Sequence, residues 1–589
     1  MDLNNKMRQF KITGKLPTKE QINGALSSFS KKERVVFGIL VLALLVSSLA
    51  LIQILNKSLM TEVPLLGGRI SEGIVGTPRF INPVLGSSPA DLDMISLIYS
   101  GLMRKNADGT LVPDLAEKHE ESDDGLTHTF TLREKIYFHN GEPVTADDVI
   151  FTIDRVKNSV ITSPEKLNWE DITAEKKDER TITFTSRQPN PNLLENATLG
   201  ILPKTLWEND SMELNDANTM PVGSGPYKIE DVSKKSSGVI NSYRLRAFDR
   251  FALGKPYIRE ISFHFYTNEE EMISALRDGE VNQVSSITPA VAETLEGENY
   301  RIESETLPRV FGLFFNQNQN QLFTDKAVTS AINLAIDKEK IVREVLHGYG
   351  IAIDGPMPSS FLPESAEIAN AEKTGREETL EKVRDMLKKA GWTDGEEGYL
   401  VKTTTAKNKK KTITTLEFSI STGNVPELVT TAELIRQDLA TVGIKVDVKT
   451  FEVGNLNHNV ISPRKYDALL FGQVINRESD LYAFWHSSQR KEPGRNVAIY
   501  TNARADSLLE DAFITLDDKR RAEKYAQFAA EVKKDVPAVF LYSPDFIYVT
   551  AKDLSGLSLK HIISPSDRFN DIYKWFTKTE NVWKIFAKN

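Results

Sequence analysis

The spacing of hydrophobic residues changes near residue 70, and the two patterns predict two kinds of structure. Residues 35–55 read VVFGILVLALLVSSLALIQIL, an uncharged run about long enough to cross the ~30 Å hydrocarbon core of a bilayer as a helix. Basic residues within 31–34 precede it, so the positive-inside tendency leaves residues 1–34 as a cytoplasmic tail. The pattern predicts a transmembrane signal anchor at 35–55 and a linker over 56–69, with all later residues outside the cytoplasm.

A cleaved signal peptide is the alternative interpretation of this segment. Ser48-Leu49-Ala50 is a small-x-small cleavage signal after a short apolar core. Against cleavage, the basic region before the core is long, and the apolar run continues as far as Leu55. We therefore expect a single-pass protein of the cell membrane, with its N-terminus in the cytoplasm.

From residue 70 onward, strand-like and helix-like patterns follow one another. Residues 127–132 (THTFTL) alternate as a strand does, and Thr145 with Asp148 is typical of a capped helix start. Helices with one apolar face are expected at 325–336, 338–347, 379–390 and 426–442, strands at 444–448 and 466–471, and an inserted surface hairpin at 393–412. Helix followed by strand, repeated, indicates α/β layers.

Composition and charge narrow the class of protein. The chain has 589 residues, more than one hydrophobic core usually serves, so several domains are expected. Residues 1–34 carry eight Lys or Arg and three Asp or Glu, a local charge of +5, which leaves −14 on the remainder of a chain whose net charge is −9. Such an acidic body argues against a nucleic-acid partner.

The sequence lacks the residues that several kinds of chemistry require. It has no cysteine, which excludes disulfides, thiolate nucleophiles, zinc–thiolate sites and a lipoprotein-type anchor. It contains no GxxxxGK[ST], HExxH or GxSxG motif, and no two of its eight histidines lie within four residues of each other. We therefore expect a protein that is not an enzyme and that needs no cofactor or metal ion.

A series of motifs resembles a known family in the order of its members' sequences. The motifs are Phe80-Ile81-Asn82-Pro83, Leu97 to Leu102, Pro113-Asp114-Leu115-Ala116, Gly125 to Leu132, Phe138 to Val149, Val222 to Tyr227, Phe315-Asn316, Ala335-Ile336-Asp337, Ala390-Gly391-Trp392 and Tyr466-Asp467. Each motif alone is weak, but their order over about 500 residues is specific. From about Gly73 to Phe576 the chain resembles the family 5 extracellular solute-binding proteins, the dipeptide-, oligopeptide- and nickel-binding group.

The resemblance implies a fold and a domain organisation. The expected fold is α/β, bilobal and periplasmic-binding-protein-like (type II), with an extra domain and one transmembrane helix before it. Domain I would comprise 70–109, 220–307 and 541–589, domain II would be 110–219, and domain III would be 308–540. Family members close two lobes over a ligand by a hinge motion, so the pocket is expected between the lobes.

The resemblance also implies two ligand-binding segments, of which the first precedes the Asn-Pro motif. In the family, a strand edge at this point pairs with the peptide backbone. Here the segment is Thr77-Pro78-Arg79-Phe80, in which Pro78 has no N–H to donate. Thr77 and Arg79 are the expected ligand-binding residues, whereas Phe80 and Ile81 are expected in the core.

The second segment follows Gly472 and departs from the family pattern. Gln473 stands where peptide-binding members have Trp, and Asn476 stands where an Asp would meet the peptide's α-ammonium. An amide lacks the charge that makes such a hydrogen bond strong. Glu478 or Asp480 could supply that charge; alternatively, the ligand is not a peptide with a free amine.

Aromatic residues follow this segment directly. Tyr482 and Trp485 could wall the pocket, since aromatic side chains combine a large apolar surface with a polar tip. The alternative is that they pack a helix against the core.

Three functions remain open at this point. The first is a monomeric receptor that captures oligopeptides or dipeptides and delivers them to an ABC permease and its ATPase, both on separate chains. The second is the same receptor for a non-peptide solute, such as an oligosaccharide, an opine-like compound or a nickel chelate. The third is a surface sensor or adhesin, although residues 1–34 are too short for a signalling domain.

Overall fold

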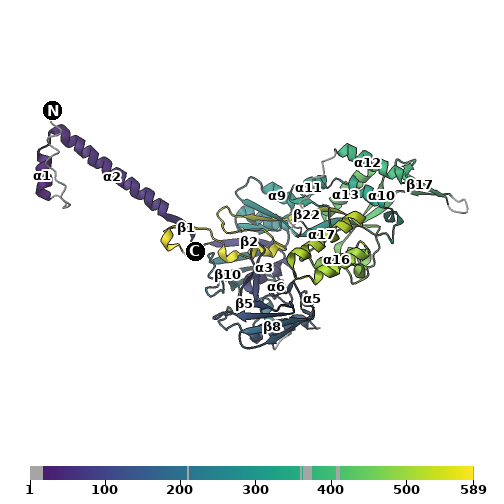
Figure 1. Cartoon of the computed structure of the whole chain (residues 1–589), viewed down its shortest axis with the longest axis horizontal. Helices are drawn as coiled ribbons and strands as arrows, with labels where there is room; N and C mark the ends of the chain where they lie inside the picture. Colours follow the sequence, from purple (N-terminus) through teal and green to yellow (C-terminus); the bar gives the residue numbers. More distant parts are fainter. Residues whose placement is uncertain are drawn as a thin grey trace. The chain divides into compact units, whose positions relative to one another are not determined.

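The computed structural model describes residues 18–158, 160–208, 211–358, 361, 375–405 and 411–587. Contacts divide the chain into two compact units, which are described separately (Figure 1). The smaller unit comprises Met1–Leu65 and Thr579–Asn589, and the larger unit comprises Leu66–Lys578.

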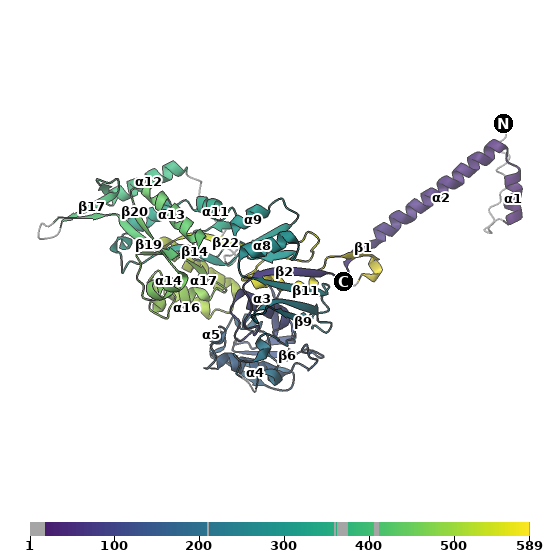
Figure 2. The same cartoon turned by 180° about the vertical axis from the view of Figure 1, so that it is seen from behind.

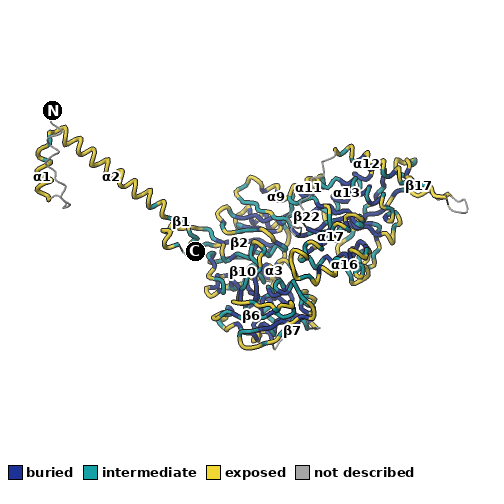
Figure 3. The backbone as a smooth tube through the Cα atoms, viewed as in Figure 1, coloured by how far each residue is buried: buried dark blue, intermediate teal, exposed yellow. Residues whose placement is uncertain are grey.

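The smaller unit contains the expected membrane helix. Helix α1 (Lys19–Ser27) is followed by α2 (Lys31–Leu59), which starts at a capping box formed by Ser30 and Glu33. Within the described residues, α2 is the one helix long and apolar enough to cross a membrane, and none of its residues is buried (Figure 3).

The expected linker over 56–69 differs from what the structure contains. Strand β1 (Met60–Pro64) follows α2 directly and pairs antiparallel with β23 (Thr579–Trp583) near the C-terminus. Residues 579–583, expected within domain I, therefore belong to the smaller unit. The reason is backbone pairing between two short segments over 500 residues apart, which no local pattern reveals.

The larger unit is built on one sheet of twelve strands. Ten strands lie in the order β20-β19-β21-β14-β22-β12-β2-β11-β10-β9, and β13 and β15 both pair with β22. Their bounds are β2 (Arg69–Val75), β9 (Tyr227–Lys234), β10 (Ile240–Ala247), β11 (Glu260–Tyr266), β12 (Gln283–Ser285), β13 (Arg301–Thr306), β14 (Arg309–Phe315), β15 (Gly350–Ala352), β19 (Glu417–Gly423), β20 (Lys445–Phe451), β21 (Ala468–Val474) and β22 (Ala538–Thr550).

Strand β22 links two parts of this sheet. Its first half pairs with β14, from Ala538 to Tyr542, and its second half pairs with β13, from Asp545 to Thr550. The chain also passes from one part of the sheet to the other between β13 and β14, at residues 307–308. The expected boundaries between domains I and III lie at or near these crossings, and the three-domain division stays a prediction, because contacts hold residues 66–578 together.

Alternate residues of β14 face two separate hydrophobic cores. Leu313 and Phe315 are buried in one core, whereas Val310 and Phe314 are buried in the other. Helices α10 (Lys326–Ala335), α11 (Lys338–Val345), α12 (Arg376–Lys389) and α13 (Pro426–Ala440) supply the first core, and α16 (Ala503–Phe513) and α17 (Asp518–Asp535) supply the second. The helices expected at 325–336, 338–347, 379–390 and 426–442 and the two following strands are confirmed.

The surface hairpin expected at 393–412 is also confirmed. It consists of β16 (Thr393–Asp394), β17 (Leu400–Thr405) and β18 (Lys411–Thr415), and all three strands pair antiparallel. The tip, residues 406–410, lies outside the described residues.

A second sheet lies within the segment expected as domain II (Figure 2). Its order is β5 (Ala116–Glu121), β6 (Thr127–Leu132), β8 (Thr181–Ser186) and β7 (Ile172–Lys176). The expected strand at 127–132 is confirmed, and every second residue is buried. Helix α4 (Ala146–Lys157) packs against it and starts as expected, with the Thr145 N–H donating to the Asp148 carboxylate at 2.9 Å.

A buried guanidinium joins distant segments of the larger unit. Arg568 lies in η8 (Pro565–Phe569), and its Nη2 is 2.6 Å from Glu72 Oε1 in β2 and 2.7 Å from Asp93 Oδ2 in α3 (Pro89–Ile98). The Tyr548 hydroxyl in β22 donates to Glu72 Oε2 at 2.9 Å. All four residues are buried. The cluster therefore attaches the C-terminal part of this unit to its first strand and first helix.

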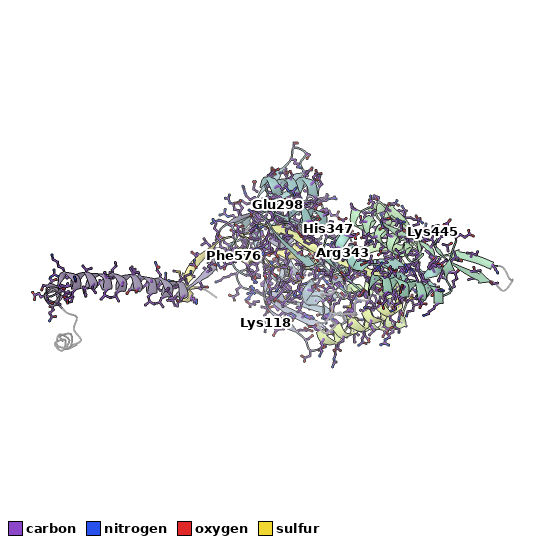
Figure 4. The ribbon with its side chains drawn as sticks, turned by 90° about the horizontal axis from the view of Figure 1, so that it is seen from above. Lys118, Glu298, Arg343, His347, Lys445 and Phe576 are labelled. Atoms are coloured by element: carbon purple, nitrogen blue, oxygen red, sulfur yellow. The ribbon has the colours of Figure 1, made fainter. Side chains whose placement is uncertain are left out.

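Removing the cation of this cluster should weaken folding severely. We expect Arg568→Met to lower the free energy of unfolding by about 3–5 kcal/mol, because Glu72 and Asp93 would be left buried without a counter-ion. Urea unfolding followed by circular dichroism measures the effect. Arg343→Gln is the matched control, since Arg343 is exposed (Figure 4). Equal midpoints for the two variants would contradict this role for Arg568.

Candidate functional site

A cavity of about 570 Å³ is lined by three parts of the larger unit. This volume is within the range of about 300–1,000 Å³ found for small-molecule sites. The expected domain I contributes Asp93, Arg104, Lys105, residues 563–567 and Asn570 to the lining. The expected domain II contributes Glu165, Glu195 and Thr198, and the expected domain III contributes Arg309, Val474, Asn476 and Arg477.

A second hollow, of about 630 Å³, is lined differently. Its walls include Arg246, Arg259, Gln283 and Asp553, all within segments expected as domain I. A receptor that closes two lobes needs groups from both lobes around its ligand. The 570 Å³ cavity meets that requirement, and we call it the interlobe cavity.

Arg477 connects two sides of the interlobe cavity. Its Nε lies 3.5 Å from Glu195 Oε2, and its Nη1 donates to Asn196 Oδ1, both in α6 (Leu193–Asn196) of the expected domain II. A second contact lies between Gly125 and Leu516: Gly125 has φ +66°, and a Cβ at this position would come within 2.5 Å of Leu516 Cδ1. Both contacts join the expected domain II to the expected domain III.

Arg309 presents an unmatched positive charge to the interlobe cavity. It is the first residue of β14 and lines the cavity. Among the described residues its guanidinium makes no ion pair, and its Nε is buried without a hydrogen-bond acceptor. Burial lowers the pKa of Arg309, since removal from water disfavours the charged form. A cation held this way favours an anionic group in the cavity.

The carboxylates around the interlobe cavity, by contrast, already have donors. Asp93 pairs with Arg568, Asp114 with Arg104 at 2.9 Å, and Glu195 with Arg477. Asn168 donates to Glu165 at 2.7 Å, and the backbone N–H groups of residues 563 and 564 donate to Asp567. The cavity therefore offers a free donor for an anion. Each of these carboxylates already accepts from at least one donor, although Asp114 Oδ1 is buried without a partner among the described residues.

The first predicted segment lies outside the interlobe cavity's lining. Thr77 and Arg79 are exposed, and neither belongs to a strand. The backbone N–H groups of Arg79 and Phe80 donate to Asp91 Oδ1 at 2.7 and 2.8 Å. These donors are thus occupied within the protein. Ile81 is buried as expected, and Phe80 is half-buried.

The second predicted segment lies partly in the interlobe cavity. Asn476 lines it. Gln473 is 2% exposed, and neither side-chain amide atom has a hydrogen-bond partner among the described residues. Asp480 accepts the backbone N–H groups of Asn476 and Arg477 at 2.8 and 3.1 Å, so it shapes the loop.

The other predicted acid, Glu478, is engaged with a partner. Its Oε2 lies 3.2 Å from Arg521 Nε. Burial raises the pKa of Glu478, although Arg521 acts in the opposite direction. Neither Glu478 nor Asp480 lines the interlobe cavity, so Asn476 is the predicted residue of this group that does.

The aromatic residues of α15 (Asp480–Trp485) pack within the protein. Trp485 is 0% exposed and contacts the rings of Phe314, Tyr500 and Phe540. Tyr482 stacks on His486, with ring centroids 4.2 Å apart. Neither lines the interlobe cavity, and these contacts favour the helix-packing interpretation.

Sequence reasoning missed Arg309 and Arg477. Arg477 stands inside a segment whose position in the site was expected, between Asn476 and Glu478. Arg309 is a charged residue at the start of an otherwise apolar strand, RVFGLFF, which is the one local signal for it. Its lack of a partner depends on the whole fold.

Loss of the Arg477 contacts should favour separation of the lobes. We expect Arg477→Ala to remove about 1 kcal/mol of contact energy, roughly a fivefold change in the open-to-closed ratio. Spin labels on Lys118→Cys and Lys519→Cys can report the distance, since the chain has no other cysteine (Figure 4 labels Lys118). The matched control is Arg490→Ala, on the exposed part of the same lobe. Identical distance distributions in both variants would contradict the role of Arg477.

Comparison with known proteins gives the class of this molecule. A family model described as bacterial extracellular solute-binding proteins, family 5 middle region, matches residues 110–494. The oligopeptide-binding protein AppA of Bacillus subtilis is 28% identical over 525 residues, covering 87% of this chain and 92% of AppA. The solved structure of AppA with a nonapeptide has a TM-score of 0.65 at 26% identity, covering 88% of this chain and 100% of that one.

A second solved structure is similar to the same extent. NikZ of Campylobacter jejuni, in complex with Ni(L-His), has a TM-score of 0.67 at 26% identity and covers 86% of this chain and 99% of that one. These likenesses confirm the expected bilobal α/β fold of an extracytoplasmic binding protein. The chain belongs to the bacterial extracellular solute-binding proteins, family 5.

Proposed function

We propose that the protein is an extracytoplasmic receptor that captures oligopeptides in the interlobe cavity and delivers them to an ABC permease. The observation that carries this proposal is a cavity of about 570 Å³ lined from both lobes, with Arg309 unmatched in its wall. Its relative AppA is named as an oligopeptide-binding protein, which supports peptide as the ligand. The role is binding and delivery rather than catalysis.

The proposed receptor acts as a monomer with separate partner chains. Helix α2 supplies one membrane crossing, with the N-terminus in the cytoplasm and the binding unit outside. One helix cannot form a translocation path, and the sequence has no P-loop for ATP. The permease and the ATPase are therefore distinct subunits.

The charges in the interlobe cavity define how a peptide would be held. A guanidinium binds a carboxylate with two parallel hydrogen bonds, so we assign the peptide's C-terminal carboxylate, or an acidic side chain, to Arg309. Each carboxylate in the cavity wall already has a donor on at least one oxygen, although Asp114 Oδ1 is buried without one among the described residues, and Asn476 adds an uncharged amide for other polar groups. This arrangement favours recognition through an acid over recognition through an α-ammonium.

A nickel chelate is the second candidate ligand, because NikZ binds Ni(L-His) and the segment after Gly472 departs from the peptide-binding pattern. Among the described residues, no group of three or more His, Asp or Glu could hold a metal ion. A chelate that brings its own ligands and a free carboxylate fits Arg309 equally well. Titration with Ni²⁺–histidine distinguishes this candidate from a peptide.

Binding should depend on the ligand's carboxylate and on Arg309. We expect a tetrapeptide library with free C-termini to bind about ten- to a hundredfold more tightly than the same library amidated, because a charge-assisted bond is worth about 1.5–3 kcal/mol. N-acetylation should change affinity little. Arg309→Gln should weaken binding of the free-acid library and abolish its preference over the amidated one. Isothermal titration of the full chain in detergent measures all three libraries.

The outcomes of this experiment separate two parts of the proposal. Lys105→Gln is the matched control, since Lys105 also lines the interlobe cavity but lies in β3 (Met103–Lys105). If the libraries bind with no preference for the acid, peptide capture stands and the role of Arg309 is wrong. If no library binds but Ni²⁺–histidine does, the ligand class is wrong and the receptor class stands.

A further inference from the structure

The smaller unit carries exposed hydrophobic side chains that the receptor function does not use. Near its C-terminus, Trp583 is 46% exposed, Ile585 77% and Phe586 72%. Residues 584–586 form a short turn, η10 (Lys584–Phe586), directly after β23. Side chains of this size rarely stay grouped in water without covering.

Hydrogen bonds fix this hydrophobic group to the end of the membrane helix. The Trp583 indole Nε1 donates to Asn56 Oδ1 at 2.9 Å, and Asn56 lies in the last turn of α2. In the β1–β23 ladder, Trp583 is the partner of Met60, the residue that follows α2. Trp583, Ile585 and Phe586 therefore lie where α2 leaves the apolar layer.

The sequence around the group has the composition of a membrane–water boundary. Lys57, in the last turn of α2, and Lys584, between Trp583 and Ile585, flank it with positive charge. Tryptophan is enriched at this boundary because its ring is apolar and its N–H is polar, and lysine reaches from there toward water. An apolar stretch of residues 35–55 ends immediately before it.

We propose that Trp583, Ile585 and Phe586 insert into the interfacial layer of the outer leaflet. The occupant of this apolar group is thus the lipid bilayer, because the group is continuous with a helix that itself crosses the bilayer. The protein would then be attached to the membrane at both ends of the chain: by α2, and by a C-terminal segment paired to it through β1. The inference rests on α2 being retained as the anchor, as proposed above.

Tryptophan fluorescence can test this insertion selectively. Five of the six tryptophans (Trp169, Trp207, Trp392, Trp485 and Trp575) are buried in the larger unit, and Trp583 is the exposed one. The full chain is placed in phosphatidylcholine vesicles that carry bromine either near the headgroup end or near the terminus of the acyl chain. We expect bromine near the headgroups to quench more than bromine near the chain ends, and Trp583→Phe to remove the quenchable part.

A second pair of variants tests the neighbouring side chains. We expect Ile585→Glu with Phe586→Glu to reduce quenching of Trp583 severalfold, since two carboxylates oppose insertion. The control is Val239→Glu, an exposed hydrophobic residue of the larger unit. All samples are first floated with the vesicles, and peptide binding is measured on them.

The possible results either support or overturn the inference. Headgroup-level quenching that disappears in the double variant supports it. Equal tryptophan fluorescence in plain and brominated vesicles overturns it. If Trp583 is then also protected from quenching by aqueous iodide, the side chain is covered by a second copy of the chain instead of lipid. A chain that does not float with vesicles overturns both the anchor and this inference, while peptide binding stands as a separate result.

Discussion

A buried guanidinium joins the first and last segments of the receptor's larger unit. Moving one charge out of water costs several kcal/mol, so Arg568 is tolerated only if Glu72 and Asp93 reach it together. Those carboxylates come from the first strand and first helix of the unit, whereas Arg568 comes from near its end. Asp93 and residues 563–567 also line the interlobe cavity. The ion pairs that join the first and last segments of this unit therefore also hold part of the cavity lining in place.

The lining of the interlobe cavity also contains a cation without such partners. Arg309 is the first residue of β14. Strand β14 pairs with the first half of β22, and β22 then continues into the other part of the sheet, where it pairs with β13. There the cation has no counter-ion among the described residues, while each carboxylate of the cavity has a donor on at least one oxygen. Burial without a partner destabilises the empty receptor, and an anionic ligand group would relieve that cost. Binding energy would thus be concentrated near the place where the lobes join.

The sequence was a good guide to elements with strong local patterns and a poor guide to long-range pairing. The strand at 127–132 and the helix cap at Asp148 could be predicted because alternation and capping residues are local signals. The motif order also identified the family. The β1–β23 pair and the Arg477 contacts could not be predicted, because each joins segments hundreds of residues apart.

The predicted site shows the same division. Asn476 lines the interlobe cavity. It could be predicted because its loop follows the family motif at Tyr466-Asp467. Thr77 and Arg79 do not line it, and Asp91 accepts the backbone N–H groups of Arg79 and Phe80. Trp485 is enclosed by rings from three other segments, and aromatic character alone cannot distinguish a pocket wall from a core.

The pairing of β1 with β23 limits how far the receptor can travel. Four residues separate Pro64, at the end of β1, from Arg69, at the start of β2, so this connection spans at most about 18 Å. If α2 anchors the chain as proposed, a receptor held by so short a connection would search for its permease in two dimensions instead of three. Its effective concentration near the membrane would then be set by the length of the connection between Pro64 and Arg69, rather than by the number of receptor molecules in solution.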